Sequence, residues 1–305
     1  MSQVKSIAVI GAGTMGSGIA LAAAMSAGSD SGGGMKVYQV DVSPEQLDRA
    51  RAYHRKTLDR SVEKERLTRA EADEVAARIS YHADLAEAAD ADWAVEAVLE
   101  KVDLKKNVFR QMQGTFRPDV VLATNTSSIS ITELATAVGD DAHRVIGMHF
   151  FNPVPIMKLV EVVKGRATSD ETMRRTIELA KKMGKTPVPA NDRPGFVSNR
   201  VLAPMINEAF WAWQEGVAEP EHIDQIMTLG CHFPMGPLRL ADYIGLDVCA
   251  NILNVMREGL GSEKYAPCPK LLELIEQGRL GDKTGRGVYE YGSYSLDPHS
   301  SGSEE

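Results

Sequence analysis

A histidine and a carboxylate suited to acid–base chemistry stand in one apolar stretch, residues 147–161, GMHFFNPVPIMKLVE. His149 ends a β-branched run, and residues 152–155 (NPVP) force a turn because proline lacks an amide donor and has a fixed φ. Glu161 lies in the next apolar run, where an unpaired carboxylate costs several kcal/mol. The turn brings the two runs back together, so we predict that His149 and Glu161 pair.

Such a pair has a defined chemical use. A carboxylate on one imidazole nitrogen fixes the tautomer and stabilises the imidazolium, which leaves the other nitrogen to take a proton near neutral pH. His149 would then be a general base and Glu161 its orienting partner. The alternative is a surface histidine with Glu161 in a salt bridge elsewhere, and the spacing alone leaves both open.

A glycine motif near the N-terminus indicates dinucleotide binding. An apolar strand over residues 4–10 ends in GAGTMG, residues 11–16, and leads into an apolar helix. Gly11 permits the tight turn, Gly13 lets the backbone approach a pyrophosphate at the helix N-terminus, and Gly16 permits close packing. The motif alone also fits a glycine-rich turn. However, a second strand ends at Asp41, where a carboxylate takes the ribose hydroxyls of NAD and repels the extra phosphate of NADP.

Two later strands end in polar residues that we expect at the same sheet edge. Residues 93–98 form a buried strand that ends near Glu96 and Glu100, and residues 120–123 form the next, which ends in TNTSS, residues 124–128. In a doubly wound sheet the ligand lies beyond the C-terminal ends of the strands, so both ends should border the cofactor. The Ser127 hydroxyl serves either a local helix cap or the ligand, and the sequence leaves both open.

A break at residues 191–195 (NDRPG) predicts a domain boundary. Before it, strands alternate with helices, so we expect an α/β, Rossmann-like NAD-binding domain over residues 1–190. Its residues 44–78 read as a charged helical arm, by default a solvated hairpin. The glycine-rich residues 28–34 read as a flexible surface loop.

The chain beyond the break has no strand pattern, which predicts an all-helical domain over residues 191–292. Two apolar runs recur at helical spacing and are expected core positions: Val197, Val201 and Met205, and then Leu202, Ile206, Phe210 and Trp213. Asn199 lies in the first turn of the same helix. The polar residues 293–305 are expected to form a disordered tail.

Composition narrows the class of protein. The 305 residues, 43% hydrophobic and 25% charged, suit a soluble two-domain protein, and a net charge of −8 argues against nucleic acid or an anionic membrane as partner. No apolar run is long enough to span a membrane, and no leader segment precedes the first strand. The three cysteines, Cys231, Cys249 and Cys268, are widely spaced and form no metal-like array. We therefore predict a cytoplasmic protein without a metal site.

Six separated segments together resemble one enzyme family: GAGTMGSGIA, TNTSS, HFFNPVPIMKLVE, RPGFVSNR, PMGPLRLADYIGLD and GDKTGRGVYEY. From about Val4 to Tyr291 the sequence is similar to the L-3-hydroxyacyl-CoA dehydrogenase family, particularly its short bacterial members, the 3-hydroxybutyryl-CoA dehydrogenases. The resemblance implies reversible, NAD-dependent oxidation of an L-3-hydroxyacyl-CoA to the 3-oxoacyl-CoA. It also implies a homodimer formed through the helical domain.

The resemblance assigns roles to individual residues. His149 and Glu161 correspond to the catalytic pair, and Ser127 and Asn199 to the substrate contacts. The NAD contacts correspond to Gly11, Gly13, Thr14, Met15, Gly16, Asp41, Glu100, Lys105, Ser127, Asn152 and Lys283. The contacts to coenzyme A correspond to Thr57, where relatives have Ser, and to Lys64. The insertion at residues 28–34 departs from the family pattern.

Two other functions remain open at this point. A related dehydrogenase acting on a free 3-hydroxy acid, such as a sugar acid or carnitine, would have no use for Lys64 as a phosphate contact. A non-catalytic NAD-binding protein would be expected to have lost catalytic positions, and none is lost in this sequence.

Overall fold

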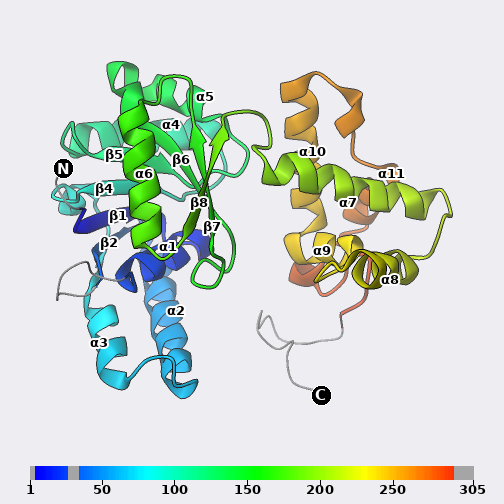
Figure 1. Cartoon of the computed structure of the whole chain (residues 1–305), viewed down its shortest axis with the longest axis horizontal. Helices are drawn as coiled ribbons and strands as arrows, with labels where there is room; N and C mark the ends of the chain where they lie inside the picture. The colour runs from blue at the N-terminus through cyan, green and yellow to red at the C-terminus, as the bar shows by residue number, and fades with distance from the viewer. Residues whose placement is uncertain (1–3, 27–33, 292–305) are drawn as a thin grey trace. The chain divides into compact units, whose positions relative to one another are not determined.

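The computed structural model describes residues 4–26 and 34–291, and the chain divides into two compact units, Met1–Arg193 and Pro194–Glu305 (Figure 1). The expected tail, and the expected loop at 28–34 apart from Gly34, lie outside the described residues. None of the helices described has both the length and the apolar character that crossing a membrane requires.

The described part of the first unit contains one eight-stranded sheet, in the order β3-β2-β1-β4-β5-β6-β7-β8 (Figure 1). The strands are β1 (Ser6–Ile10), β2 (Lys36–Val40), β3 (Ile79–His82), β4 (Trp93–Glu96), β5 (Val121–Thr124), β6 (Val145–Phe150), β7 (Leu159–Lys164) and β8 (Thr186–Asn191). Neighbouring strands are parallel except for β6 and β7. The strand order reverses direction between β1 and β4, which is where a doubly wound sheet binds its ligand. The expected α/β, Rossmann-like class is confirmed.

Helices connect the strands of the first unit. They are α1 (Thr14–Ala24), α2 (Pro44–Glu63), α3 (Arg69–Ala77), η1 (Leu85–Ala88), α4 (Val102–Thr115), α5 (Ile131–Ala135), η2 (Thr136–Arg144) and α6 (Asp170–Lys182). In Figure 1, α1 and α6 cover one face of the sheet and α4 covers the other. Both faces of the sheet are therefore covered, which explains why its central strands β1, β4 and β6 are buried at every position.

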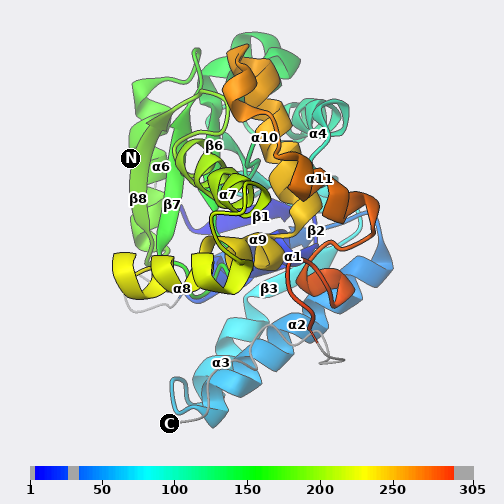
Figure 2. The same ribbon diagram turned by 90° about the vertical axis from the view of Figure 1, so that its right-hand side faces the viewer.

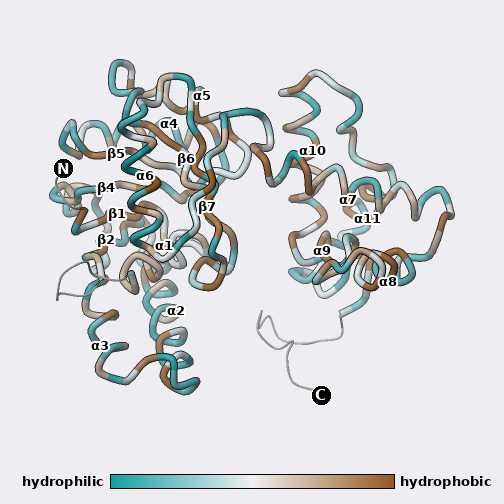
Figure 3. The backbone as a smooth tube through the Cα atoms, in the orientation of Figure 1, coloured by the Kyte–Doolittle hydropathy of each residue, from teal (hydrophilic) through white to brown (hydrophobic). Residues whose placement is uncertain are grey.

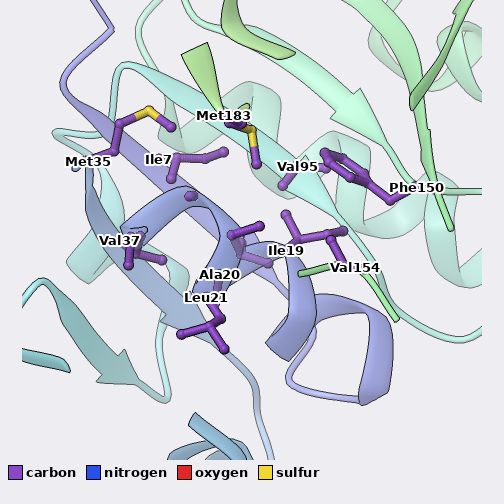
Figure 4. Packing of buried hydrophobic residues seen from close by; sticks show 14 of the residues in the cluster. Ile7, Ile19, Ala20, Leu21, Met35, Val37, Val95, Phe150, Val154 and Met183 are labelled. Atoms are coloured by element: carbon purple, nitrogen blue, oxygen red, sulfur yellow. The ribbon is translucent and has the colours of Figure 1, made fainter. Parts of the chain in front are cut away.

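The core under α1 and α6 uses every second residue of the strands. Figure 4 shows Ile19 and Leu21 of α1 close to Ile7, Val37 and Val95 of the sheet. Because side chains alternate along a strand, those between the core positions point to the opposite face. In β6 and β7 these alternate positions include His149 and Glu161, since Met148 and Val162 lie in the core cluster.

Helices α2 and α3 form the arm expected from residues 44–78, and they lie side by side in Figures 1 and 2. In Figure 3, α2 is largely hydrophilic, whereas α3 mixes hydrophilic and apolar residues. A buried histidine fastens α2 to the sheet unit: His54 Nε2 donates to the Ser17 carbonyl oxygen, and Nδ1 accepts from the Tyr81 hydroxyl, each at 2.8 Å. Burial lowers the pKa of His54, which keeps the ring neutral and both hydrogen bonds intact.

A carboxylate determines where the first unit ends. Asp192 accepts hydrogen bonds from the Ser130 hydroxyl at 2.7 Å and from the Ile131 and Thr132 amides at 3.1 and 2.8 Å. These bonds satisfy amides at the N-terminus of α5 and fix residue 192 to the first unit. The division between the two compact units falls after Arg193, within the break at residues 191–195.

The described part of the second unit is helical. Its helices are α7 (Ser198–Gln214), α8 (Pro220–Cys231), α9 (Pro237–Ile244), α10 (Leu246–Leu260), η3 (Glu263–Tyr265), α11 (Pro269–Glu276) and η4 (Asp282–Thr284). Ile206 and Phe210 of α7 are buried in its core, as the helical spacing predicts. The expectation that Val197 and Val201 are core positions is wrong, since they are 54% and 66% exposed. Helical spacing identifies an apolar stripe, but it does not say which stripe faces the unit's own core.

The glycine-rich segment near the C-terminus is held by one buried carboxylate. Asp242 of α9 accepts from the Val288 amide at 2.8 Å, the Tyr289 amide at 3.0 Å and the Tyr291 hydroxyl at 2.7 Å. A side chain at Gly287 would overlap this carboxylate. The close approach explains the need for glycine in GRGVY.

Candidate active site

The β6–β7 hairpin places His149 directly opposite Glu161 in the strand register. The imidazole Nδ1 lies 2.8 Å from Glu161 Oε2, and both side chains are buried. Because an ionised carboxylate only accepts, Nδ1 carries the proton and the basic lone pair is on Nε2. The pairing expected from the cost of burying Glu161 is thus present in the structure.

Two polar side chains that the sequence did not single out hold this hairpin. Asn125 Oδ1, at the end of β5, accepts from the Phe150 amide at 2.8 Å. Lys185 Nζ donates to the carbonyl oxygens of Val154 and of Met157, the latter at 2.9 Å, so the turn after His149 is tied to the start of β8. Burial lowers the pKa of Lys185. Asn152, an expected NAD contact, is exposed in the same turn, where its peptide bond to Pro153 is cis.

The glycine motif forms a tight loop between β1 and α1. Gly11 has a φ of +105°, and a Cβ there would come within 2.6 Å of the Ala97 carbonyl oxygen, so only glycine fits. A Cβ at Gly16 would overlap the Gly11 carbonyl oxygen. A Cβ at Gly13 would meet no atom within 4 Å, which leaves open space at the helix N-terminus. Thr14 and Met15 open α1 beside it, and backbone amides at such a position suit a pyrophosphate.

Asp41 lies at the end of β2, next to this loop. Its Oδ2 accepts from the Ala12 amide at 2.7 Å, and its Oδ1 accepts from the Ser43 amide at 2.9 Å. Each carboxylate oxygen has two lone pairs, so both keep capacity for a ribose hydroxyl. The loop and the carboxylate together fit an adenosine diphosphate with free ribose hydroxyls.

Glu100 accepts several hydrogen bonds from the turn that contains Ser127. Its Oε1 accepts from the Thr126 hydroxyl at 2.6 Å, the Ser127 amide at 2.9 Å and the Ser128 hydroxyl at 3.1 Å. Burial opposes ionisation of Glu100, but the charge of Lys105 and these hydrogen bonds outweigh it and hold the pKa of Glu100 below its usual range. The serine turn after β5 and the loop after β4 are thus one connected structure.

The other expected site residues lie on separate helices. Thr57 and Lys64 belong to the arm, where the Thr57 hydroxyl donates to the Tyr53 carbonyl oxygen at 2.8 Å. Asn199 is in the first turn of α7, in the second unit. Lys283, also in the second unit, pairs with Asp247, with Nζ 2.6 Å from Oδ2. Among residues 4–26 and 34–291, no group of His, Cys, Asp or Glu side chains could hold a metal ion.

The chain matches two family models. Residues 6–193 match the model described as 3-hydroxyacyl-CoA dehydrogenase, NAD binding domain, and residues 195–291 match 3-hydroxyacyl-CoA dehydrogenase, C-terminal domain. Together the two models cover both compact units.

Named relatives agree with the models. The chain is 51% identical over 289 residues to a probable 3-hydroxybutyryl-CoA dehydrogenase of Bacillus subtilis, covering 95% of this chain and 98% of the relative. It is 44% identical over 288 residues to the 3-hydroxybutyryl-CoA dehydrogenase of Bradyrhizobium diazoefficiens, covering 94% and 96%. The crystal structure of (S)-3-hydroxybutyryl-CoA dehydrogenase from Ralstonia eutropha superposes with a TM-score of 0.90 at 44% identity, covering 95% of this chain and 99% of that one. The resemblance read from the sequence is confirmed, and the chain belongs to the family of NAD-dependent 3-hydroxyacyl-CoA dehydrogenases.

Proposed function

We propose that the protein catalyses the reversible oxidation of L-3-hydroxybutyryl-CoA, or a closely related L-3-hydroxyacyl-CoA, to the 3-oxoacyl-CoA. The observation that carries the proposal is the buried hydrogen bond between His149 Nδ1 and Glu161 Oε2. It supplies an oriented base within a unit that matches an NAD-binding family model. The names of the relatives, 3-hydroxybutyryl-CoA dehydrogenases, support this substrate class.

In the proposed reaction, side chains of the protein carry out the proton transfer. Glu161 holds the Nδ1 proton, so His149 Nε2 takes the proton of the C3 hydroxyl as the C3=O bond forms. The Glu161 carboxylate stabilises the imidazolium that results. In the reverse direction the protonated His149 returns the proton to the C3 oxygen. Bound NAD would accept the hydride that leaves C3.

Ser127 and Asn199 are the proposed substrate contacts. We assign them to hydrogen bonds with the reacting oxygens, which orient the substrate and stabilise developing charge. The proposed NAD contacts are those of the glycine loop, Gly11, Gly13, Thr14, Met15 and Gly16, with Asp41, Glu100, Ser127, Asn152 and Lys283. Lys105 is a further proposed NAD contact.

The arm offers a site for the phosphates of coenzyme A. Lys56, Arg60 and Lys64 are four residues apart along α2 and its C-cap, and none of them makes an ion pair with another described residue. Residues at this spacing share one helix face. Thr57 lies beside that face and adds a hydroxyl. We propose that this basic face holds the phosphates, with Thr57 and Lys64 as contacts.

This proposal is tested by comparing the coenzyme A thioester with the free acid as substrate. Purified protein with NADH should reduce acetoacetyl-CoA, and kcat/KM for free acetoacetate should be lower by about 10²-fold or more, because the binding energy of the coenzyme A portion is lost. NADPH should replace NADH poorly. Turnover of free 3-oxo acids without turnover of the ester would instead assign the protein to a dehydrogenase of free 3-hydroxy acids.

We also propose that the protein is a homodimer formed through the helical unit. Apolar side chains are exposed there, among them Val201, Ile226 and Leu229, the last of these 85% exposed. Exposed apolar side chains of this kind commonly mark subunit interfaces. Sedimentation equilibrium should give about twice the chain mass of 33.2 kDa, and a monomer at micromolar concentration would contradict the proposal.

A cytoplasmic location is proposed on the basis of the cysteines. Cys231, Cys249 and Cys268 are all free thiols, as a reducing compartment favours. Recovery of the protein from the medium or the periplasm of fractionated source cells would contradict it.

A further inference from the structure

The last residues of β6 extend past the end of β5. The register pairs Leu122–Thr124 of β5 with Val145–Gly147 of β6, and β6 continues beyond these pairs to Phe150. On its other side β6 is paired with β7 as far as Phe150. The segment that carries His149 therefore has a full neighbouring strand on one side and only the end of β5 on the other.

The side chain of Asn125 supports β6 where β5 has ended. Asn125 is the first residue after β5, and its own amide donates to the Glu96 carbonyl oxygen of β4 at 2.8 Å. Its Oδ1 accepts from the Phe150 amide at 2.8 Å, and since an amide N–H only donates, the oxygen of the side chain must face it. Asn125 thus joins the ends of β4 and β6 across the end of β5, and its Oδ1 replaces the carbonyl oxygen of a further paired residue.

The hydrogen bond to Phe150 lies one residue from the proposed base. Phe150 is 2% exposed, and its ring packs in the core under α1 and α6, on the opposite face of the strand from His149. If Oδ1 is removed, a buried amide loses its acceptor, and the end of the strand must move or admit water to satisfy it. Either change displaces the backbone from which the imidazole projects.

We propose that Asn125 is a positioning residue for His149 and that it acts through the Phe150 amide. The inference rests on the proposed function, because it takes His149 as the general base. Glu161 fixes the tautomer and the orientation of the ring from β7, whereas Asn125 fixes the backbone at the end of β6. Both are needed, because a general base acts only within hydrogen-bond reach of the proton that it removes.

The proposal is tested by a double-mutant cycle between Asn125→Ala and His149→Gln. Asn125→Ala should lower kcat about 10- to 10²-fold in the wild-type background, because a misplacement of about 1 Å costs up to that much. In the His149→Gln background the same change should lower kcat less than about threefold, because the base that Asn125 positions is already absent. Equal fold losses in the two backgrounds would overturn the proposal, and so would a change confined to KM.

Asn125→Asp separates the oxygen of the side-chain amide from its nitrogen. Aspartate keeps an oxygen that accepts from the Phe150 amide, but it has no donor in place of Nδ2. Its kcat should therefore stay within about fivefold of wild type, since an ionised oxygen is at least as good an acceptor. A loss as large as that of Asn125→Ala would assign the effect to Nδ2 and would overturn the proposal.

Thr168 supplies a matched control at the other end of the same strand. Its hydroxyl donates to the Val145 carbonyl oxygen at the start of β6, at 2.6 Å, and accepts from the Gly165 amide at 3.0 Å. Thr168→Val removes both hydrogen bonds and should lower the melting temperature by a few degrees. It should change kcat less than about twofold, because the bonds are at the end of β6 remote from His149. A fall in kcat equal to that of Asn125→Ala would mean that any weakening of β6 impairs the enzyme, and would overturn the proposal.

Hydrogen–deuterium exchange tests the same contact without substrate. The Phe150 amide should exchange about 10-fold or more faster in Asn125→Ala than in wild type, and near the wild-type rate in Asn125→Asp. Unchanged exchange in Asn125→Ala would overturn the proposal. If that variant does not fold, Asn125→Ser, whose hydroxyl ends short of the position of Oδ1, replaces it in both measurements. A wild-type protein inactive on acetoacetyl-CoA would refute the proposed function while leaving the exchange measurement intact.

Discussion

Replacing His149 with glutamine is expected to lower kcat by about 10²- to 10⁴-fold, the usual share of a general base. Glutamine retains a donor for Glu161 Oε2 and fills similar space, so the hydrogen bond of 2.8 Å in the β6–β7 hairpin has a substitute. It cannot take up a proton at neutral pH. Affinity for NADH should stay within a few-fold of wild type, because the glycine loop and Asp41 are on other strands.

His143→Gln is the matched control for this prediction. His143 is exposed, and its Nδ1 contacts the Asp140 carbonyl oxygen at 2.9 Å in η2. For both variants, kcat is measured by steady-state kinetics with acetoacetyl-CoA, and the affinity for NADH by fluorescence titration. An unimpaired His149→Gln enzyme would remove the proposed base, whereas equal losses in the two variants would point to a general effect of losing histidine.

Replacing Asp41 with alanine is expected to raise the NADPH to NADH ratio of kcat/KM by about 10- to 10²-fold. A carboxylate at the end of β2 would face the 2′-phosphate of NADPH, and like charges brought together cost several kcal/mol. The change also removes the acceptor of the Ala12 and Ser43 amides, so the affinity for both cofactors should fall. The NADPH to NADH ratio of kcat/KM is the informative quantity, because a loss of order in the loop weakens the binding of both cofactors.

Asp48→Ala is the matched control for the loss of a carboxylate. Asp48 is exposed on α2 and pairs with Arg51 at 2.9 Å, so its loss should leave the ratio unchanged. Kinetics with the two cofactors at saturating acetoacetyl-CoA give the ratio for each variant. An Asp41→Ala ratio equal to that of wild type would mean that Asp41 does not face the ribose.

Two kinds of feature could be predicted from the sequence: motifs with a fixed spacing, and charged side chains whose burial is costly unless they are paired. The glycine spacing and the acidic residue after the second strand located the nucleotide loop, because each has a steric or electrostatic requirement that few residues meet. The pairing of His149 with Glu161 followed from the cost of an isolated carboxylate between valines. The Rossmann-like class followed from alternating strands and helices, although β3 was not identified, because its short polar sequence (ISYH) resembles a loop.

Contacts that depend on tertiary packing could not be predicted. Asn125 and Lys185 hold the β6–β7 hairpin through backbone atoms 25 and 31 residues away, and no local pattern marks such partners. Lys105 is on an amphipathic helix, where a lysine normally faces solvent, so only the packing of α4 against β4 reveals that it is buried. Val201 looked like a core residue because periodicity does not distinguish a unit's own core from an exposed apolar surface.

Transfer of deuterium from cofactor to substrate tests the central claim most directly. The protein would be incubated with acetoacetyl-CoA and NADH that carries deuterium at both C4 positions, and the product analysed by mass spectrometry. The account predicts 3-hydroxybutyryl-CoA with one deuterium, located at C3, formed by wild type and about 10²- to 10⁴-fold more slowly by His149→Gln. Absence of the hydroxyacyl-CoA product, or a product without deuterium at C3, would contradict it.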